Sequence, residues 1–238
     1  MGDSDNEFLP LTRVIPKELL PLTEEPLIQR PVKEALDCGA REVDFILPSG
    51  RKKEVVEHFK REEDSLASFS YLSTKKNSKN NQLFSRLKGK IADDVFILAS
   101  SDVIFQGKDS ATKQLFSVHR TSQKPVVALR EVSDEEMSDS IIVETERIAS
   151  RLYKIKEVLE NPAPEDTDSR LALSHKYILT PSLFDHLEDA EDVLTSVVRA
   201  LDGLIDAGKT VYGHECEGEW YHITDKSSYI NTLKTFLN

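Results

Sequence analysis

The side chains that could do chemistry in this chain include two carboxylates that stand at the ends of predicted elements. Asp102 follows the run Asp93–Leu98, whose apolar residues do not alternate with polar ones and therefore predict a central strand. A carboxylate at a strand end either binds a cation such as Mg²⁺ or only ends the strand and caps the next turn. Asp225 stands directly before the predicted last helix, where an N-cap is the expected role and metal binding the alternative.

Other reactive residue types give weaker signals. The lysines of Lys75–Lys79 could attract an anionic partner, although a solvated loop is the expected reading. The six histidines show no zinc-binding spacing, and the chain has no Walker motif and no nucleophile elbow. Cys38 and Cys216 lie far apart and neither belongs to a C-x-x-C pair, which favours reduced, metal-free thiols in a cytoplasmic protein.

The elements that must position these residues follow one another in the order typical of an α/β protein. Strand, turn and helix in succession favour crossover connections and a mostly parallel sheet. The segment 64–90 is rich in Ser, Asn and Lys and predicts a variable polar surface loop. The periodicity predicts helices over 26–36, 52–61, 193–205 and from 226 to 237, strands over 43–47, 125–132 and 171–179, and hairpins over 140–159 and 211–223.

Length and charge set further limits. A chain of 238 residues with 39% hydrophobic residues is long enough for one domain with a sizeable core, and we expect a single domain over residues 1–238. The formal net charge of −11 opposes binding to nucleic acid and to anionic membranes. No apolar run approaches the ~18 residues of a membrane span, and no signal peptide is visible.

The segment Phe8–Leu22, which reads FLPLTRVIPKELLPL, is the most specific motif of the chain. With Glu25–Gln29, Glu160-Asn161-Pro162 and Tyr177–Pro181 following in order, the chain resembles the sugar-1-phosphate nucleotidyltransferases, most closely bacterial UTP–glucose-1-phosphate uridylyltransferases. The resemblance implies the nucleotide-diphospho-sugar transferase fold. That fold is Rossmann-like α/β, with a mixed, mostly parallel sheet flanked by helices and a small antiparallel insertion.

The resemblance also implies a site. In this family a sugar phosphate attacks the α-phosphate of UTP and expels pyrophosphate, so the protein mainly positions the reactants and neutralises charge. Lys17 of the P-K-E motif would contact phosphate, Asp102 and Asp225 would bind Mg²⁺, and Glu160 of the E-K-P motif would bind the substrate.

Several positions depart from the family pattern. Asp3-Ser4-Asp5 stands where the family has phosphate-cradling glycines, Glu7 where it has an arginine, and Asn161 where it has the E-K-P lysine. The family's base-binding glycine-rich segment is not visible in 64–90. We therefore expect an N-terminally truncated or degenerate member of the family.

Two functions follow from this pattern. The first is a non-catalytic binding or regulatory paralogue that needs no cofactor, assembles with itself or with an active sugar-nucleotide enzyme, and still binds UTP or UDP-glucose. The alternative is a divergent, active uridylyltransferase that uses Mg²⁺, Lys17, Asp102 and Asp225, with compensating lysines from 64–90. A sensor that binds nucleotide or sugar without turnover is a third reading.

Overall fold

The computed structural model describes residues 6–48, 52–60, 67–74, 81–91, 95–188, 190 and 192–237. The chain forms two compact units. The first unit comprises Met1–Ser78, Ser100–Gln106 and Glu219–Asn238, and the second comprises Lys79–Ala99 and Gly107–Gly218. The single nucleotidyltransferase-like domain expected over 1–238 stays a prediction.

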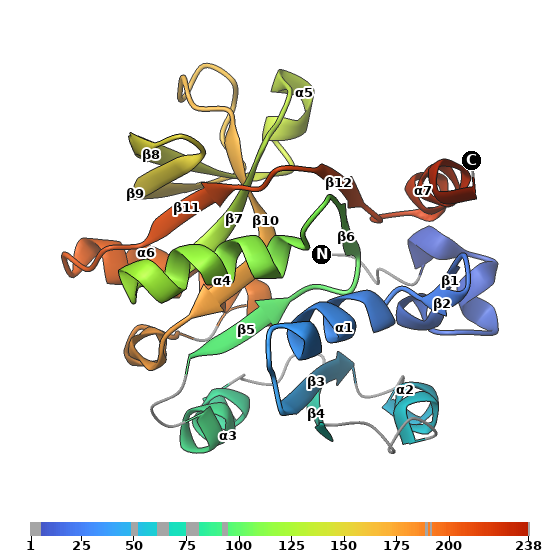
Figure 1. Ribbon diagram of the computed structural model, residues 1–238. Coiled ribbons are helices and arrows are strands. Elements are labelled where there is room, and N and C mark those ends of the chain that lie inside the picture. Colours follow the sequence, from blue (N-terminus) through green and yellow to red (C-terminus); the bar gives the residue numbers. More distant parts are fainter. Residues whose placement is uncertain are drawn as a thin grey trace. The chain divides into compact units, whose positions relative to one another are not determined.

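The first unit is built from short elements of the chain's beginning, a short central stretch and the chain's end (Figure 1). Its elements are η1 Asn6–Phe8, η2 Leu11–Arg13, η3 Lys17–Leu19, β1 Pro21–Leu22, β2 Glu25–Pro26, α1 Gln29–Asp37, β3 Glu42–Pro48, α2 Lys52–Lys60, β4 Ser68–Thr74, β6 Val103–Gln106, β12 Glu219–His222 and α7 Lys226–Leu237.

Two apolar clusters hold the first unit together. One gathers the signature segment, β6 and α7, and includes the fully buried Phe8 and Leu22. The other lies against the parallel pair β3–β4, where the Phe45 and Phe59 rings pack with centroids 4.6 Å apart. Strand β6 pairs antiparallel with β12, and this pairing joins the middle of the chain to its end.

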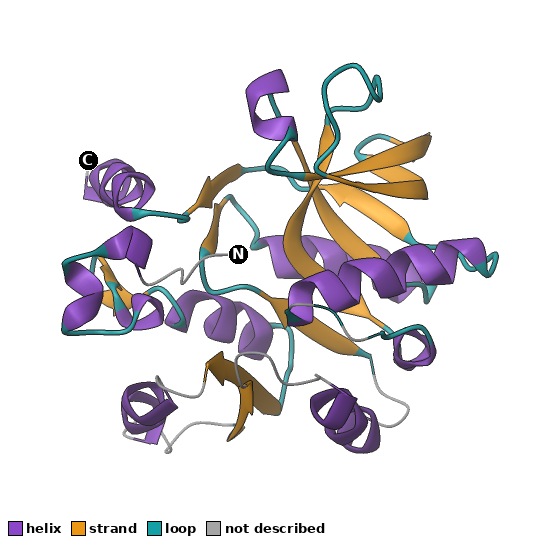
Figure 2. Ribbon diagram, turned by 180° about the vertical axis from the view of Figure 1, so that it is seen from behind, coloured by secondary structure: helices purple, strands orange, loops and turns teal. Residues whose placement is uncertain are grey.

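The second unit is a sheet with helices on its two faces, α4 on one and α6 on the other (Figures 1 and 2). Its elements are α3 Asn81–Ile91, β5 Phe96–Ala99, α4 Ala111–Ser122, β7 Val126–Glu131, α5 Asp134–Met137, β8 Ile141–Ala149, β9 Leu152–Glu160, β10 Leu171–Leu179, η4 Pro181–Asp185, α6 Val193–Asp206 and β11 Tyr212–Glu215.

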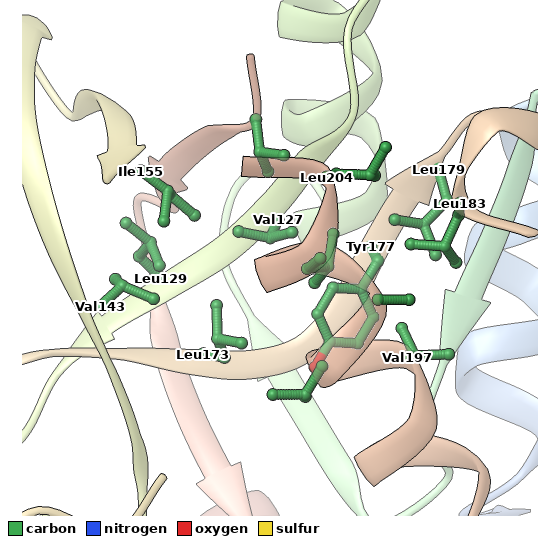
Figure 3. Close-up of a cluster of buried hydrophobic side chains, with 14 residues drawn as sticks. Val127, Leu129, Val143, Ile155, Leu173, Tyr177, Leu179, Leu183, Val197 and Leu204 are labelled. Atoms are coloured by element: carbon green, nitrogen blue, oxygen red, sulfur yellow. The ribbon is translucent and has the colours of Figure 1, made fainter. Parts of the chain in front are cut away.

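The six strands of the second unit lie in the order β5-β10-β7-β11-β9-β8. The apolar face of α6 packs on β7, β9 and β10 and forms the core drawn in Figure 3. Tyr177 of β10 is fully buried in this core, where Leu129 and Val127 of β7 also lie. Burial of the Tyr177 ring raises the pKa of its phenol far above the ordinary value, so the hydroxyl stays neutral.

Most of the predicted elements are confirmed, and the expected antiparallel insertion is the hairpin β8–β9. The strand expected to be central over Asp93–Leu98 corresponds to β5, which lies at an edge of the six-stranded sheet and pairs with β10. The mostly parallel sheet is wrong for the described strands: only β3–β4 and β7–β11 pair in parallel. The reason is that β10 returns through the hairpin without a helical crossover, so it runs antiparallel to both β5 and β7.

Two further expectations need correction, and one helix was missed. The segment 64–90, predicted to be a polar loop, contains β4 and α3, because its aromatic and leucine side chains supply a strand and an apolar helix face among the polar residues. The predicted hairpin over 211–223 is wrong, since β11 pairs with β7 and β9 while β12 pairs with β6. Helix α4 was not predicted.

No helix of the described part is long and apolar enough to cross a membrane.

Candidate functional site

Lys17 and Asp102, 85 positions apart in the sequence, meet in the first unit. Lys17 is the first residue of η3, directly after the N-cap residue Pro16. Its Nζ donates a hydrogen bond of 2.9 Å to Asp102 Oδ2. The two side chains are 18% and 31% exposed, so the ion pair is partly shielded but still reachable from solvent.

Two further hydrogen bonds hold Asp102 in place, one through its backbone and one through its side chain. Its carbonyl oxygen accepts a 2.8 Å hydrogen bond from the N–H of Ile223, immediately after β12. The other carboxylate oxygen, Oδ1, accepts a hydrogen bond from the hydroxyl of Ser100. A carboxylate and a hydroxyl are the oxygen donors that Mg²⁺ accepts in proteins. Their chemistry fits a magnesium ion, with the remaining ligands coming from water and substrate phosphates.

The described residues contain no cluster of three or more His, Cys, Asp or Glu side chains that could hold a metal ion. A magnesium ion at Asp102 would therefore depend on oxygens that a bound nucleotide supplies, as is common at nucleotide sites. Binding of Mg²⁺ by Asp102 stays a prediction.

Asp225 is engaged at the start of α7. Its Oδ1 accepts hydrogen bonds from the backbone N–H of Ser228 at 2.7 Å and from the Ser228 hydroxyl at 2.8 Å. These bonds make Asp225 the N-cap of α7, the role expected first from the sequence. They also lower the pKa of its carboxyl below the usual 3.8.

We expect Asp225→Ala to lower the free energy of unfolding by about 1 kcal/mol, because the first turn of α7 loses its cap. Since the folded-state pKa of Asp225 is depressed, this contribution is complete above pH ~4 and is lost as pH falls through the folded-state value. Urea denaturation of both proteins at pH 7 and near pH 3 measures it. Asp225→Asn keeps a cap and should lose less; equal stability of Asp225→Ala and the parent at pH 7 would contradict the cap.

Glu160 ends β9 in the second unit and pairs with Arg199 of α6, with 3.2 Å between Arg199 Nε and Glu160 Oε1. The next residue, Asn161, has a left-handed φ of 51°, a conformation that Asn adopts more readily than other side chains. Its N–H donates to the carbonyl oxygen of Ser140 at 3.0 Å. Both residues of the Glu160-Asn161 pair thus have structural partners within this unit.

The sequence reasoning missed a polar bulge in β10. Leu173 pairs with Leu129 and Tyr177 with Val127, so the three residues between them face a single residue of β7. The three are Ser174, His175 and Lys176. Bulges of this kind are frequent beside active sites. The sequence signal that could have revealed the bulge is the polar run Ser-His-Lys within an otherwise apolar strand.

Inside the bulge, His175 has a left-handed φ of 49°, and its Nδ1 lies 3.0 Å from the Tyr177 hydroxyl. Ser174 is fully buried, and its hydroxyl has no hydrogen-bond partner among the described residues. A buried hydroxyl without a partner is uncommon and costs stability. The bulge is therefore a strained and incompletely satisfied polar element of the second unit.

Ser174→Ala is expected to raise the free energy of unfolding by about 1 kcal/mol, because it removes a buried hydroxyl without removing a hydrogen bond. Ser169 is the matched control: its hydroxyl donates to the carbonyl oxygen of Val143 at 2.7 Å, so Ser169→Ala should lower stability by about 1 kcal/mol. Thermal unfolding of the two variants compares them. A loss of stability in Ser174→Ala would show that its hydroxyl is satisfied.

Of the lysines of segment 64–90 that were considered as compensating phosphate-binding cations, only some lie in the described part of the chain. Lys75 and Lys76 lie outside the described residues. Lys88 belongs to the second unit, where its ammonium contacts Asp185 at 2.7 Å. Glu7, which the sequence resemblance assigns to the position of the family's arginine, lies in η1 and is exposed.

Comparisons with known proteins identify the family of the chain. The model of the nucleotidyl transferase family matches residues 4–238. UTP–glucose-1-phosphate uridylyltransferase 1 of Staphylococcus saprophyticus is 26% identical, over 96% of this chain and 88% of that protein. The corresponding enzyme of Staphylococcus epidermidis is 25% identical over 94% of this chain and 86% of its own length.

Solved structures give the same result for the fold. A UDP-glucose pyrophosphorylase in complex with UDP-glucose superposes with a TM-score of 0.81 at 26% identity, covering 98% of this chain and 95% of that one. A UTP-bound enzyme from Acinetobacter baumannii gives 0.77 at 18% identity, covering 98% and 89%, which supports the fold alone. The chain belongs to the nucleotidyl transferase family, has the nucleotide-diphospho-sugar transferase fold, and is a relative of bacterial UTP–glucose-1-phosphate uridylyltransferases.

Proposed function

We propose that this protein is a non-catalytic paralogue of the uridylyltransferases, which binds UTP or UDP-glucose and acts through binding. Its partner would be a second copy or an active sugar-nucleotide enzyme. The relatives are uridylyltransferases by name, and one similar structure contains UDP-glucose. These findings support the ligand class, and the composition of the site supports the lack of turnover.

The reaction of the relatives depends on positive charge around the transferred phosphoryl group. This chain has Glu7 and Asn161 where the family pattern has cations. Removing one preorganised donor typically lowers the catalytic rate 10²- to 10³-fold, so two such losses would lower it about 10⁴-fold or more.

The observation that carries the proposal is that the Glu160-Asn161 pair serves the architecture of the second unit. Glu160 pairs with Arg199, and Asn161 occupies a left-handed position at the end of β9. A lysine at position 161 would have to adopt that left-handed conformation, which costs about 1 kcal/mol more than for Asn. Asn161 thus suits the backbone at the position from which the family draws its sugar-phosphate cation.

A specific observation also favours the alternative, an active Mg²⁺-dependent uridylyltransferase. Lys17 and Asp102 are the phosphate and metal residues expected from the family, and they converge in the first unit. If the Lys17–Asp102 pair opens around a nucleotide, turnover could follow with cations from outside the described residues.

The deciding experiment combines binding and turnover. Thermal unfolding is followed with UTP, UDP-glucose and glucose-1-phosphate, each with and without Mg²⁺, and pyrophosphate release is measured in parallel. A ligand at 100 times its Kd should stabilise the protein by about 2.7 kcal/mol. We expect stabilisation by UTP or UDP-glucose, and pyrophosphate release at least about 10⁴-fold slower than by the staphylococcal relative.

Asp102→Asn is the control for a contaminating enzyme, since it removes the expected metal ligand. Mg²⁺-dependent release that disappears in Asp102→Asn would establish the active alternative. No stabilisation by any of the three ligands would remove the nucleotide from the proposal. Light scattering of the protein, alone and mixed with an active uridylyltransferase from the same organism, then tests the partner.

A further inference from the structure

The six-stranded sheet of the second unit ends in two different edge strands, β8 and β5 (Figure 1). Strand β8 carries charged side chains, falls out of register with β9 at two places, and has Ile142 paired back to Ala172 of β10. Charges and bulges of this kind are devices by which proteins keep an edge strand from pairing with other chains. The edge at β8 is therefore protected.

Strand β5 has none of these devices. Its sequence is Phe-Ile-Leu-Ala over Phe96–Ala99, without a charge, a proline or a bulge, and its residues are only half-buried. It pairs with β10 along one side. On the other side, which we call the open edge of β5, none of the described residues hydrogen-bonds to the backbone of Phe96–Ala99. Since alternate residues of an antiparallel strand point their N–H and C=O groups away from the partner, every second residue of β5 presents these groups at the open edge.

The side chains of β5 indicate what an added strand must look like. Phe96 and Leu98 pack against the core cluster that α6 covers, and the centroids of the Phe96 and Phe184 rings lie 5.5 Å apart. Because side chains alternate along a strand, Ile97 and Ala99 point to the opposite face of the sheet. A strand added at the open edge would extend both faces, so it needs apolar side chains on both of them.

We propose that the open edge of β5 binds an extended apolar segment of a partner protein, which joins the sheet as a further strand. In this mode of recognition, backbone hydrogen bonds supply affinity and side chains supply specificity. The net charge of −11 and the acidic pair Asp93-Asp94, directly before Val95 in the sequence, favour a segment flanked by Lys or Arg. The inference rests on the proposal that the protein acts by binding a partner, and it does not require nucleotide binding.

The first experiment measures residue-resolved amide hydrogen exchange by NMR. In the protein alone, we expect every second amide of Phe96–Ala99 to exchange rapidly, because it has no hydrogen-bond partner. The probe is the peptide acetyl-Lys-Val-Ile-Val-Val-Lys-amide; at about ten times its Kd it should slow these amides about 10-fold, while the amides at the edge of β8 stay unchanged. Slow exchange already in the protein alone would mean that the edge is covered, and would overturn the proposal.

Two control peptides separate strand addition from general apolar attraction, with binding followed by fluorescence anisotropy. The first is the probe with its four central amides N-methylated, which keeps the apolar side chains but cannot donate hydrogen bonds, so it should bind at least about 10-fold more weakly. The second, acetyl-Lys-Val-Thr-Val-Thr-Lys-amide, is apolar on one face only and should also bind at least about 10-fold more weakly. Binding of either control as tight as that of the probe would contradict the proposal.

Ile97→Lys and Ile148→Lys are matched variants of the protein, since each adds one positive charge to an edge strand, β5 or β8. A lysine on an edge strand opposes further pairing, so Ile97→Lys should weaken probe binding about 10-fold or more, and Ile148→Lys should leave it unchanged. Ala99→Lys makes the same test at the end of β5 if Ile97→Lys does not fold. Equal weakening in the β5 and β8 variants would mean that only charge acts, and the open edge would then not be the site.

These outcomes separate strand addition from ligand binding. If the probe protects β5 while UTP and UDP-glucose fail to stabilise the protein, the partner site stands and the nucleotide part of the proposed function fails. If the nucleotides stabilise the protein and the probe leaves β5 exchange unchanged, nucleotide binding stands and strand addition fails. Self-association of the protein alone that the probe reverses, seen by light scattering, would assign the edge to a second copy and overturn a different partner.

Discussion

Phe8→Ala is expected to lower the free energy of unfolding by about 3–5 kcal/mol, although Phe8 belongs to the motif that identifies the family. The Phe8 ring is 0% exposed and packs among Leu20, Leu22 and Ile104 in a core cluster of the first unit. Truncation to Ala removes a buried ring and leaves a cavity, and both effects destabilise the folded state. Urea denaturation followed by circular dichroism measures the loss.

Val14→Ala is the matched control, because Val14 lies in the same segment but is 89% exposed. Its effect should stay within about 0.5 kcal/mol. If Phe8→Ala also changed stability by less than that, Phe8 would not be part of the core, and the signature would have to be read as a binding segment.

The contrast between these two positions explains why the fold could be predicted from the sequence. The signature Phe8–Leu22 contains several apolar residues that pack into the core and one lysine, Lys17, that reaches a candidate site residue. A resemblance carried by such a segment therefore reports mostly on packing, which tolerates few alternatives. The comparisons, which extend over almost the whole chain, confirm the family and the fold.

The segment 64–90 shows where the same reasoning failed. Composition pointed to a polar loop, yet Phe69 and Tyr71 of β4 stack on Phe45 of β3. In α3, Leu83 and Phe84 are buried while several neighbours are exposed. A few apolar side chains decide whether a segment packs, and counting Ser, Asn and Lys over 27 residues hid them.

For the site, the sequence indicates candidate residues but not how their side chains pair. Lys17 and Asp102 were singled out separately, and only the fold shows that they contact each other. Asp225 was expected first as an N-cap, and its bonds to Ser228 confirm that role. The partner of Glu160, Arg199, lies 39 positions away in another element, beyond the reach of any local pattern.

The bulge in β10 was beyond the sequence reasoning for a different reason. A strand pattern records which residues alternate, but not where two strands fall out of register. Ser174–Lys176 stands opposite a single residue of β7, and this mismatch exists only once the two strands are paired.

The same β7 presents the second large effect, at its contact with β11. A Cβ added at Gly213 would lie 2.4 Å from Cδ1 and 2.9 Å from Cγ of Leu129, which is 0% exposed. Because Cγ itself lies within 3 Å of the added atom, rotation of Leu129 about χ2 cannot make room, and a change of χ1 would have to be accommodated inside the packed core. Gly213→Ala should therefore lower the free energy of unfolding by about 1–3 kcal/mol, whereas Gly89→Ala, in a helix with open space around it, should raise it by about 0.5–1 kcal/mol.

Leu129→Ala should cost about 2–5 kcal/mol on its own, because it leaves a cavity in the core drawn in Figure 3. In that background the clash at Gly213 disappears, and the new methyl group fills part of the cavity. The double variant Leu129→Ala/Gly213→Ala should thus be more stable than the sum of the single losses predicts, by about 0.5–3 kcal/mol. Urea denaturation of the parent, the two single variants and the double variant completes this double-mutant cycle. If the losses of unfolding free energy were strictly additive, the two strands would have to separate enough to accept the extra methyl group.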